Sequence, residues 1–195
     1  MQTTWKTGGE KIHARIIDIS TREYDAERII VEGFLKEDRY LDTHTITGET
    51  LPRGTIHHMV IRLLVNCSTF VIEDLDMELI SVPRDFCRET MGFLAPVKGM
   101  TIAPGFTAKV KKLVGGNKGC THVMELLLAM APTVVQGVAT RRAHRPSGVD
   151  TEQAKMILKY LINTCHAWRE DGPFVEMHKE MIQKALRLQE CDPVK

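Results

Sequence analysis

The chain has 195 residues, of which 43% are hydrophobic and 26% are charged, and its formal net charge is +1. This composition is typical of a globular protein, and the length is enough to bury a core without disulfides or metals. The balanced charge, with no basic stripe, argues against nucleic acid or an anionic membrane as a partner.

The N-terminal residues 1–10 are polar and lack the apolar core of a secretory signal, so they are predicted to be a flexible N-terminus. The longest apolar stretch, residues 126–135, is shorter than a membrane span and contains Pro132. A cytoplasmic protein is therefore expected, with no membrane contact. In that compartment the five cysteines are expected to be thiols, ligands or nucleophiles rather than disulfides.

The first part of the chain has the two-residue period of β-strands. The pattern predicts two antiparallel strands, at residues 12–19 and 28–35, joined by a polar turn at 21–25. Residues 40–54 are rich in Thr, Asp, Gly and Pro and are predicted to be a long loop.

Two further strands are predicted at residues 56–65 and 70–80, with a hairpin connection at 66–69. The first of these strands has an apolar face formed by alternate residues, which are Met59, Ile61, Leu63 and Val65.

Beyond residue 82 the period changes to that of helices. Pro132 is expected to kink or split the third of the predicted helices, which is otherwise apolar on two faces and therefore predicted to be buried. Asp150 or Thr151 is expected to cap the fourth, which has a single apolar stripe. The five predicted helices cover residues 83–94, 104–113, 121–142, 150–165 and 174–188.

Strands followed by helices predict an α+β fold, with an antiparallel sheet covered on one face by helices. One domain is expected over residues 1–195, mainly β in 11–82 and mainly α in 83–195, with a core plus an appended helical segment as the alternative.

The most informative motif lies between two of the predicted helices. A glycine-rich turn, residues 115–119, delivers Cys120 and His122 to the start of an apolar helix. Both side chains can bind a metal, and a thiol at a helix N-terminus ionises more readily because unpaired N–H groups favour negative charge there. Lys118 precedes Gly119 and no Gly-Lys-Ser/Thr follows, so no nucleotide site is expected.

Further candidate metal ligands lie at the ends of other predicted elements: His57 and His58 at a strand start, Cys87 in a first helical turn, and the Cys165-His166 pair at a helix end. No pair has the C-x-x-C spacing of a local zinc or iron–sulfur motif. A site would therefore have to be assembled from separate elements.

Simpler interpretations compete with a functional one. Cys67 and Cys191 are expected to be small buried hydrophobic residues. Glu125, one turn after His122, could orient an imidazole or face solvent. Four other histidines have polar neighbours and are expected on the surface: His13, His44, His144 and His178.

Two segments, Ile56-His57-His58-Met59 and Gly119-Cys120-Thr121-His122, resemble a bacterial family known as domain of unknown function 2889. The likeness runs from about residue 11 to 136 and includes Cys87. The family pattern has His-Asp-Met where this chain has His57-His58-Met59, and it prefers glycine where Arg39 stands. The resemblance implies no established activity.

The order of elements is also loosely similar to iron–sulfur scaffold proteins of the NifU and IscU type. In those scaffolds a Cys at a strand, a second Cys after a hairpin and a His-Cys pair at a later helix converge on one metal or cluster. Here His57-His58 enters a strand, Cys87 follows the hairpin, and Cys120 and His122 open a later helix. The resemblance implies a scaffold-like core with an extra N-terminal hairpin and extra C-terminal helices.

The leading hypothesis is a zinc or iron site, with an iron–sulfur cluster as one form of it. The proposed ligands are Cys87, Cys120 and one or both of His57 and His122, with His58 as a further candidate; mixed thiolate and imidazole ligands suit these metals. One alternative is a metal-free enzyme with Cys120 as nucleophile and His122 or His57 as base. The other is a non-catalytic module whose helical part docks a partner.

Overall fold

The computed structural model describes residues 8–144 and 151–191. The chain divides into two compact units, the first ending at Thr140 and the second beginning at Arg141. The single domain expected over residues 1–195 stays a prediction. Each unit is described by itself below.

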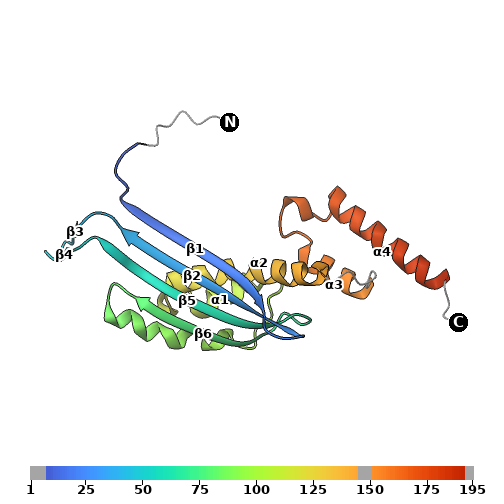
Figure 1. Ribbon diagram of the computed structural model, residues 1–195, viewed down its shortest axis with the longest axis horizontal. Coiled ribbons are helices and arrows are strands. Elements are labelled where there is room, and N and C mark those ends of the chain that lie inside the picture. The colour runs from blue at the N-terminus through green and yellow to red at the C-terminus, as the bar shows by residue number, and fades with distance from the viewer. Residues whose placement is uncertain (1–7, 145–150, 192–195) are drawn as a thin grey trace. The chain divides into compact units, whose positions relative to one another are not determined.

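The first unit is built on a four-stranded antiparallel sheet in the order β1-β2-β5-β6 (Figure 1). The strands are β1 (His13–Glu23), β2 (Arg28–Arg39), β5 (Gly54–Asn66) and β6 (Ile72–Ser81). The predicted antiparallel α+β fold is thus confirmed. The predicted long loop holds a small separate hairpin, which is formed by β3 (Thr43–His44) and β4 (Thr50–Leu51).

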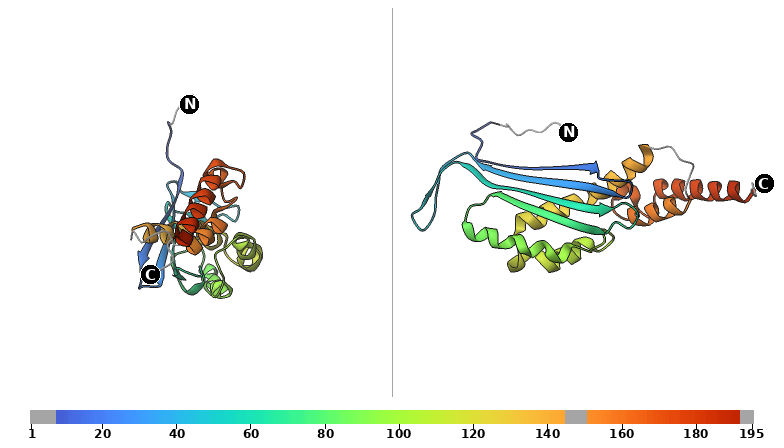
Figure 2. Two further views of the ribbon diagram at one scale, coloured as in Figure 1. Left: turned by 90° about the vertical axis from the view of Figure 1, so that its right-hand side faces the viewer. Right: turned by 60° about the horizontal axis from the view of Figure 1, so that its bottom comes forward.

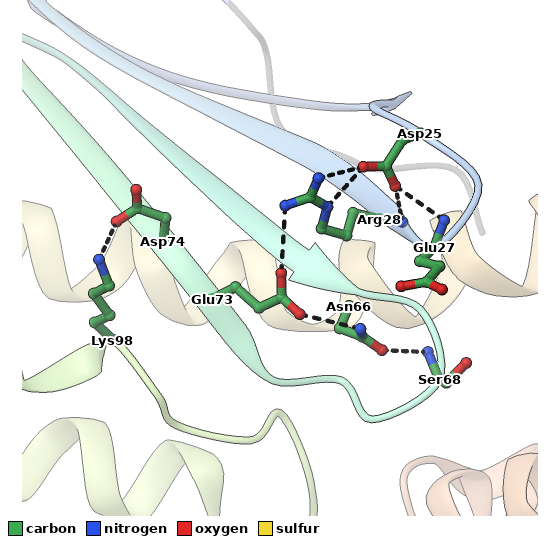
Figure 3. Close-up of polar contacts among 8 residues, drawn as sticks. All are labelled: Asp25, Glu27, Arg28, Asn66, Ser68, Glu73, Asp74 and Lys98. Atoms are coloured by element: carbon green, nitrogen blue, oxygen red, sulfur yellow. Dashed lines mark hydrogen bonds and ion pairs between the residues drawn. The ribbon is translucent and has the colours of Figure 1, made fainter.

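The turn between β1 and β2 lies later than the sequence pattern indicated. A carboxylate oxygen of Asp25 accepts hydrogen bonds from the backbone N–H groups of Glu27 and Arg28, both at 2.9 Å (Figure 3). Arg28 also pairs with Asp25 and, across the sheet, with Glu73. Asp25 therefore stabilises the turn by accepting hydrogen bonds from local N–H groups, and β1 pairs with β2 as far as Glu23.

The β5–β6 connection is likewise stabilised by a side-chain oxygen that accepts hydrogen bonds from backbone N–H groups. The amide oxygen of Asn66 accepts hydrogen bonds from the N–H groups of Ser68 and Thr69, at 2.9 and 3.1 Å. This confirms the predicted hairpin connection at residues 66–69.

One face of the sheet forms the core of the first unit. The predicted apolar face of β5 is confirmed, because Met59, Ile61, Leu63 and Val65 are all at most 1% exposed. The helices of this unit lie on that side of the sheet (Figure 2). They are a long 3₁₀ segment η1 (Asp85–Val97), α1 (Phe106–Val114), the short η2 (Gly116–Lys118) and α2 (Thr121–His144).

One helical element differs from expectation, and a second settles one of two alternatives. The segment predicted at residues 83–94 is a 3₁₀ helix and runs on to Val97, with Pro96, which has no N–H to donate, inside it. Of the two alternatives predicted for Pro132, a split of helix α2 is excluded, whereas a kink stays a prediction. Met130 and Val134, on either side of the proline, are both fully buried, so packing holds the two halves of α2 on one core.

Two glycines allow α2 to approach the sheet closely. A Cβ atom on Gly33 of β2 would lie 2.6 Å from the Met130 sulfur, and one on Gly137 of α2 would lie 2.5 Å from the Thr21 methyl group. No side chain larger than hydrogen fits at either position without movement. These contacts allow a short distance between α2 and strands β1 and β2.

Of the described helices, α2 is long and apolar enough to cross a membrane by length and composition alone. Core helices of globular proteins reach the same apolarity, and 33% of this apolar stretch is buried in the structure, with Leu126 and Met130 lying against Gly33 of the sheet. The cytoplasmic location stays a prediction.

The second unit is a pair of helices, α3 (Thr151–Leu161) and α4 (Pro173–Cys191), joined through a short 3₁₀ turn η3 (His166–Trp168). Leu158, Val175 and Ile182 form its buried cluster. The predicted cap residue Asp150 lies outside the described residues, as does the side chain of Cys191.

The Gly33 contact yields a test of the packing. Gly33→Ala should lower the free energy of unfolding by about 1–3 kcal/mol, because the new methyl group overlaps buried Met130. Gly92→Ala is the matched control, since a Cβ there meets nothing within 4 Å. It should stay within about 0.5 kcal/mol of the parent protein in urea unfolding. Equal stability of the two variants would contradict the packing described.

Candidate metal centre

A buried carboxylate lies where β2, β5 and the first turn of α2 meet. Glu37 continues the inward-facing register of β2, after Ile29, Val31 and Leu35, and is only 4% exposed. Carboxylates are rarely this buried unless they are paired. Its partners therefore define the site.

Two imidazoles contact the same oxygen of Glu37. Nδ1 of His57 donates a 2.6 Å hydrogen bond to Oε2, and Nε2 of His122 lies 3.1 Å from that atom. The two rings lie face to face, with centroids 3.8 Å apart and planes tilted by 30°. Of the described residues, these three form the one group of His, Cys, Asp or Glu ligand atoms that all lie within 4.8 Å of one another.

The local backbone explains why His57 meets Glu37. The two residues are paired in the β2–β5 register, and the register then shifts so that Asp38 pairs with Thr55. A second shift lies between His58 and Met59 on the side of β6. Irregular pairing of this kind bends a strand and redirects its side chains, and it is frequent beside functional sites.

The other carboxylate oxygen of Glu37 is held from β1. Nε of Arg15 donates a 2.5 Å hydrogen bond to Oε1, and Nη1 of the same guanidinium pairs with Glu125 of α2. Glu125 thus binds an arginine, and not an imidazole as one sequence interpretation had it. Arg15 links the edge strand, the buried carboxylate and the helix.

The electrostatics of the group favour a carboxylate beside a neutral imidazole. Burial raises the pKa of Glu37, but the hydrogen bond from Arg15, the attraction to His122 when that imidazole is protonated, and the hydrogen bond from His57 together hold the pKa below its usual value. Burial, followed by repulsion from His57, lowers the pKa of His122. Neutral His122 can act as a ligand or as a base.

The thiol of Cys120 lies on the far side of His122 from Glu37. Its Sγ is 3.7 Å from Nδ1 of His122, within hydrogen-bonding range for sulfur. Cys120 immediately precedes α2, and its carbonyl accepts the first helical hydrogen bond, from the N–H of Met124. Cys120, His122 and Glu37 therefore form a continuous chain of contacts through the two ring nitrogens.

The structure separates the residues singled out in the sequence. It brings His57 and His122 together and places Cys120 beside His122. His58 lies on the opposite face of the sheet, because neighbouring side chains of a strand point to opposite faces. There its ring packs edge-on against Phe34, at 4.8 Å between centroids. Cys87, in η1, is half-buried and is not part of the three-residue group.

Sequence reasoning missed Glu37, and one signal could have revealed it. In the run of alternating inward residues of β2, Glu37 occupies the next inward position after Leu35. A charged residue in an apolar register marks either the end of the buried face or a paired, functional group. Only the partners on β1, β5 and α2 decide between these, and they come from distant parts of the chain.

Comparison with known proteins places the chain in a family. The family described as "Protein of unknown function (DUF2889)" matches residues 13–136, which is more than half of the chain. The chain belongs to this family. Neither a curated protein nor a solved structure matches it. The matched segment of this DUF2889 protein runs from the start of β1 into α2, so it includes Glu37, His57 and His122. The resemblance to NifU and IscU scaffolds stays a prediction.

The two lowered pKa values predict an acid-sensitive fold. Both groups bind protons more readily in the unfolded chain, so stability must fall as pH falls. The contribution of His122 is complete above about pH 6.5, and that of Glu37 above about pH 4.5; each is lost as the pH drops through its lower folded-state pKa. Urea unfolding of metal-free protein should therefore show stability declining below pH 6.5 and again below pH 4.5.

His122→Gln should lack the upper part of that decline, because glutamine does not titrate. His44→Gln, which changes an exposed imidazole of β3, is the control and should keep the profile of the parent protein. If the free energy of unfolding declines equally in both variants between pH 7 and 5, the assignment of this decline to His122 is contradicted.

Proposed function

We propose that this protein binds a single zinc or ferrous ion through Glu37, His57 and His122. The observation that carries the proposal is the convergence of two imidazole nitrogens on one carboxylate oxygen, at 2.6 and 3.1 Å. Ligand atoms that share a metal at about 2.0–2.2 Å lie roughly 3 Å apart, which is close to this spacing. Small side-chain movements would admit the ion.

The ligand types point to the metal. Two imidazoles and one carboxylate suit zinc, and the same set with open positions is used by non-haem iron(II) enzymes. Magnesium and calcium prefer oxygen ligands throughout. Three protein ligands leave at least one position for water or substrate, so the arrangement supports a catalytic rather than a purely structural ion.

The surrounding contacts would orient the ligands. Arg15 binds Oε1 of Glu37 and leaves Oε2 for the metal, and the Cys120 sulfur is placed to accept a hydrogen from Nδ1 of His122. That tautomer leaves the Nε2 lone pair for the ion. Partners that fix ligands in this way commonly support metal affinity.

An iron–sulfur cluster is a weaker form of the proposal. Clusters are held mainly by thiolates, whereas the described group of three contains no cysteine. A mononuclear ion is therefore preferred to the cluster that the sequence left open.

The metal proposal predicts one zinc ion per chain, measured by elemental analysis and chelator competition on protein purified without a His tag. His57→Ala and His122→Ala should each lower zinc affinity at least about 100-fold, since each removes a direct ligand. His58→Ala and Cys87→Ser are the matched controls and should bind zinc like the parent protein. His58 is the better control, because it neighbours His57 in the same strand but faces the other side.

Two results would refute the site. One is parent protein that binds no zinc or iron above the level of the His57→Ala variant. The other is loss of binding in His58→Ala or Cys87→Ser with retention in His57→Ala.

A second candidate function rests on Cys120. The 3.7 Å contact from its sulfur to Nδ1 of His122 places a base beside a thiol, with Glu37 on the other ring nitrogen. This is the order of nucleophile, base and orienting carboxylate used in covalent catalysis. It needs the proton of neutral His122 on Nε2, whereas the metal site needs it on Nδ1. One imidazole therefore cannot serve both functions at once.

The nucleophile candidate predicts selective alkylation. In metal-free protein at about pH 6.5, iodoacetamide should modify Cys120 faster than the exposed Cys165, and His122→Gln should remove that advantage. Added zinc should slow the reaction, because the bound metal keeps the proton on Nδ1. Mass spectrometry of tryptic peptides measures each cysteine separately.

Equal rates at Cys120 and Cys165, with and without chelator, would end the nucleophile candidate and leave the metal proposal standing. The third hypothesis, a docking module in the helical C-terminal part, stays a prediction.

A further inference from the structure

His13 stands beside the proposed metal ligands although its polar sequence neighbours predicted only a surface residue. It is the first residue of β1 and lies two residues before Arg15, so both side chains face the same side of the sheet as Glu37. Nε2 of His13 is 3.8 Å from Oε1 of Glu37. That distance is too long for a hydrogen bond to the carboxylate.

Solvent exposure increases in order across the cluster. The side chains of Glu37, His57 and His122 are 6%, 15% and 23% exposed, and that of His13 is 46% exposed. The three proposed ligands are thus the more buried members of the cluster. His13, on the edge strand of the sheet, is the most exposed.

Of the groups that reach Glu37 from β1, only His13 can become a ligand. The Arg15 guanidinium also lies on this side, but it carries no lone pair and remains positively charged, so it cannot coordinate a cation. An imidazole is a good zinc ligand. His13 lies outside the group of ligand atoms that are within 4.8 Å of one another, so its side chain must move to reach an ion bound there.

We propose that His13 is a fourth, solvent-side ligand of the metal bound by Glu37, His57 and His122. This inference rests on the proposed metal site and refines it. A set of three imidazoles and one carboxylate fills the four positions of tetrahedral zinc. Because His13 is the most exposed member, it is the ligand that an incoming substrate would displace, and the site would alternate between four and three protein ligands.

The test uses two readouts on the full chain with zinc alone as the probe. Chelator competition measures affinity, and diethyl pyrocarbonate, which acylates accessible neutral imidazoles, measures protection of each histidine by peptide mass spectrometry. His13→Ala should lower zinc affinity at least about tenfold while the stoichiometry stays at one ion per chain. His44→Ala, at another exposed histidine, is the control and should leave affinity unchanged.

In the parent protein, zinc should protect His13 from acylation and leave His44 as reactive as before. A purely structural role for His13 would not produce zinc-dependent protection. Unchanged reactivity of His13 on zinc addition, or unchanged affinity in His13→Ala, overturns the inference. If the parent protein binds one ion and loses it in His57→Ala, such a result overturns only the role of His13. If the parent protein binds no ion, the proposed metal site itself is wrong.

Discussion

The organisation of the first unit depends on a single buried carboxylate. Glu37 lies in the inward register of a central strand, where an unpaired charge would cost several kcal/mol. Its two oxygens are satisfied by groups from three other elements: Arg15 from β1, His57 from β5 and His122 from α2. The need to pair Glu37 therefore positions the end of the sheet relative to the start of the helix.

The remaining length of α2 is positioned by shape rather than charge. Gly33 lets Met130 lie directly on β2, and Gly137 admits Thr21 of β1. Helix α2 is thus held by polar contacts to Glu37 at its first turn and by close van der Waals packing at Gly33 and Gly137 further along. Such an arrangement keeps His122 in place while leaving the polar end open toward the β1 edge, where Arg15 and His13 lie. Buried ligands beside a more exposed residue would suit the proposed site, which has to hold an ion and admit a second molecule.

The two proposed functions require different tautomers of His122, which differ in the ring nitrogen that carries the proton. Cys120 and Glu37 contact opposite sides of the ring, so each could stabilise a different tautomer. A metal selects one of them and a thiol nucleophile the other. The metal function is preferred because His57 adds a second imidazole to the same carboxylate oxygen, which a cysteine nucleophile does not require.

The sequence by itself determined the class of fold and part of the candidate site. Two-residue alternation identified the four main strands and the buried face of β5, because side chains of a strand alternate regardless of what they pack against. The glycine turn before Cys120 identified the start of α2. The sequence also identifies His57 and His122 as residues that can bind a metal or a proton.

Only the tertiary structure decided which residues lie together. Glu37 and Arg15 become partners through strand pairing between β1 and β2. His58 is separated from His57 by the pleat, and Cys87 lies outside the group. Convergence of side chains from distant segments is a property of packing, which local periodicity does not encode.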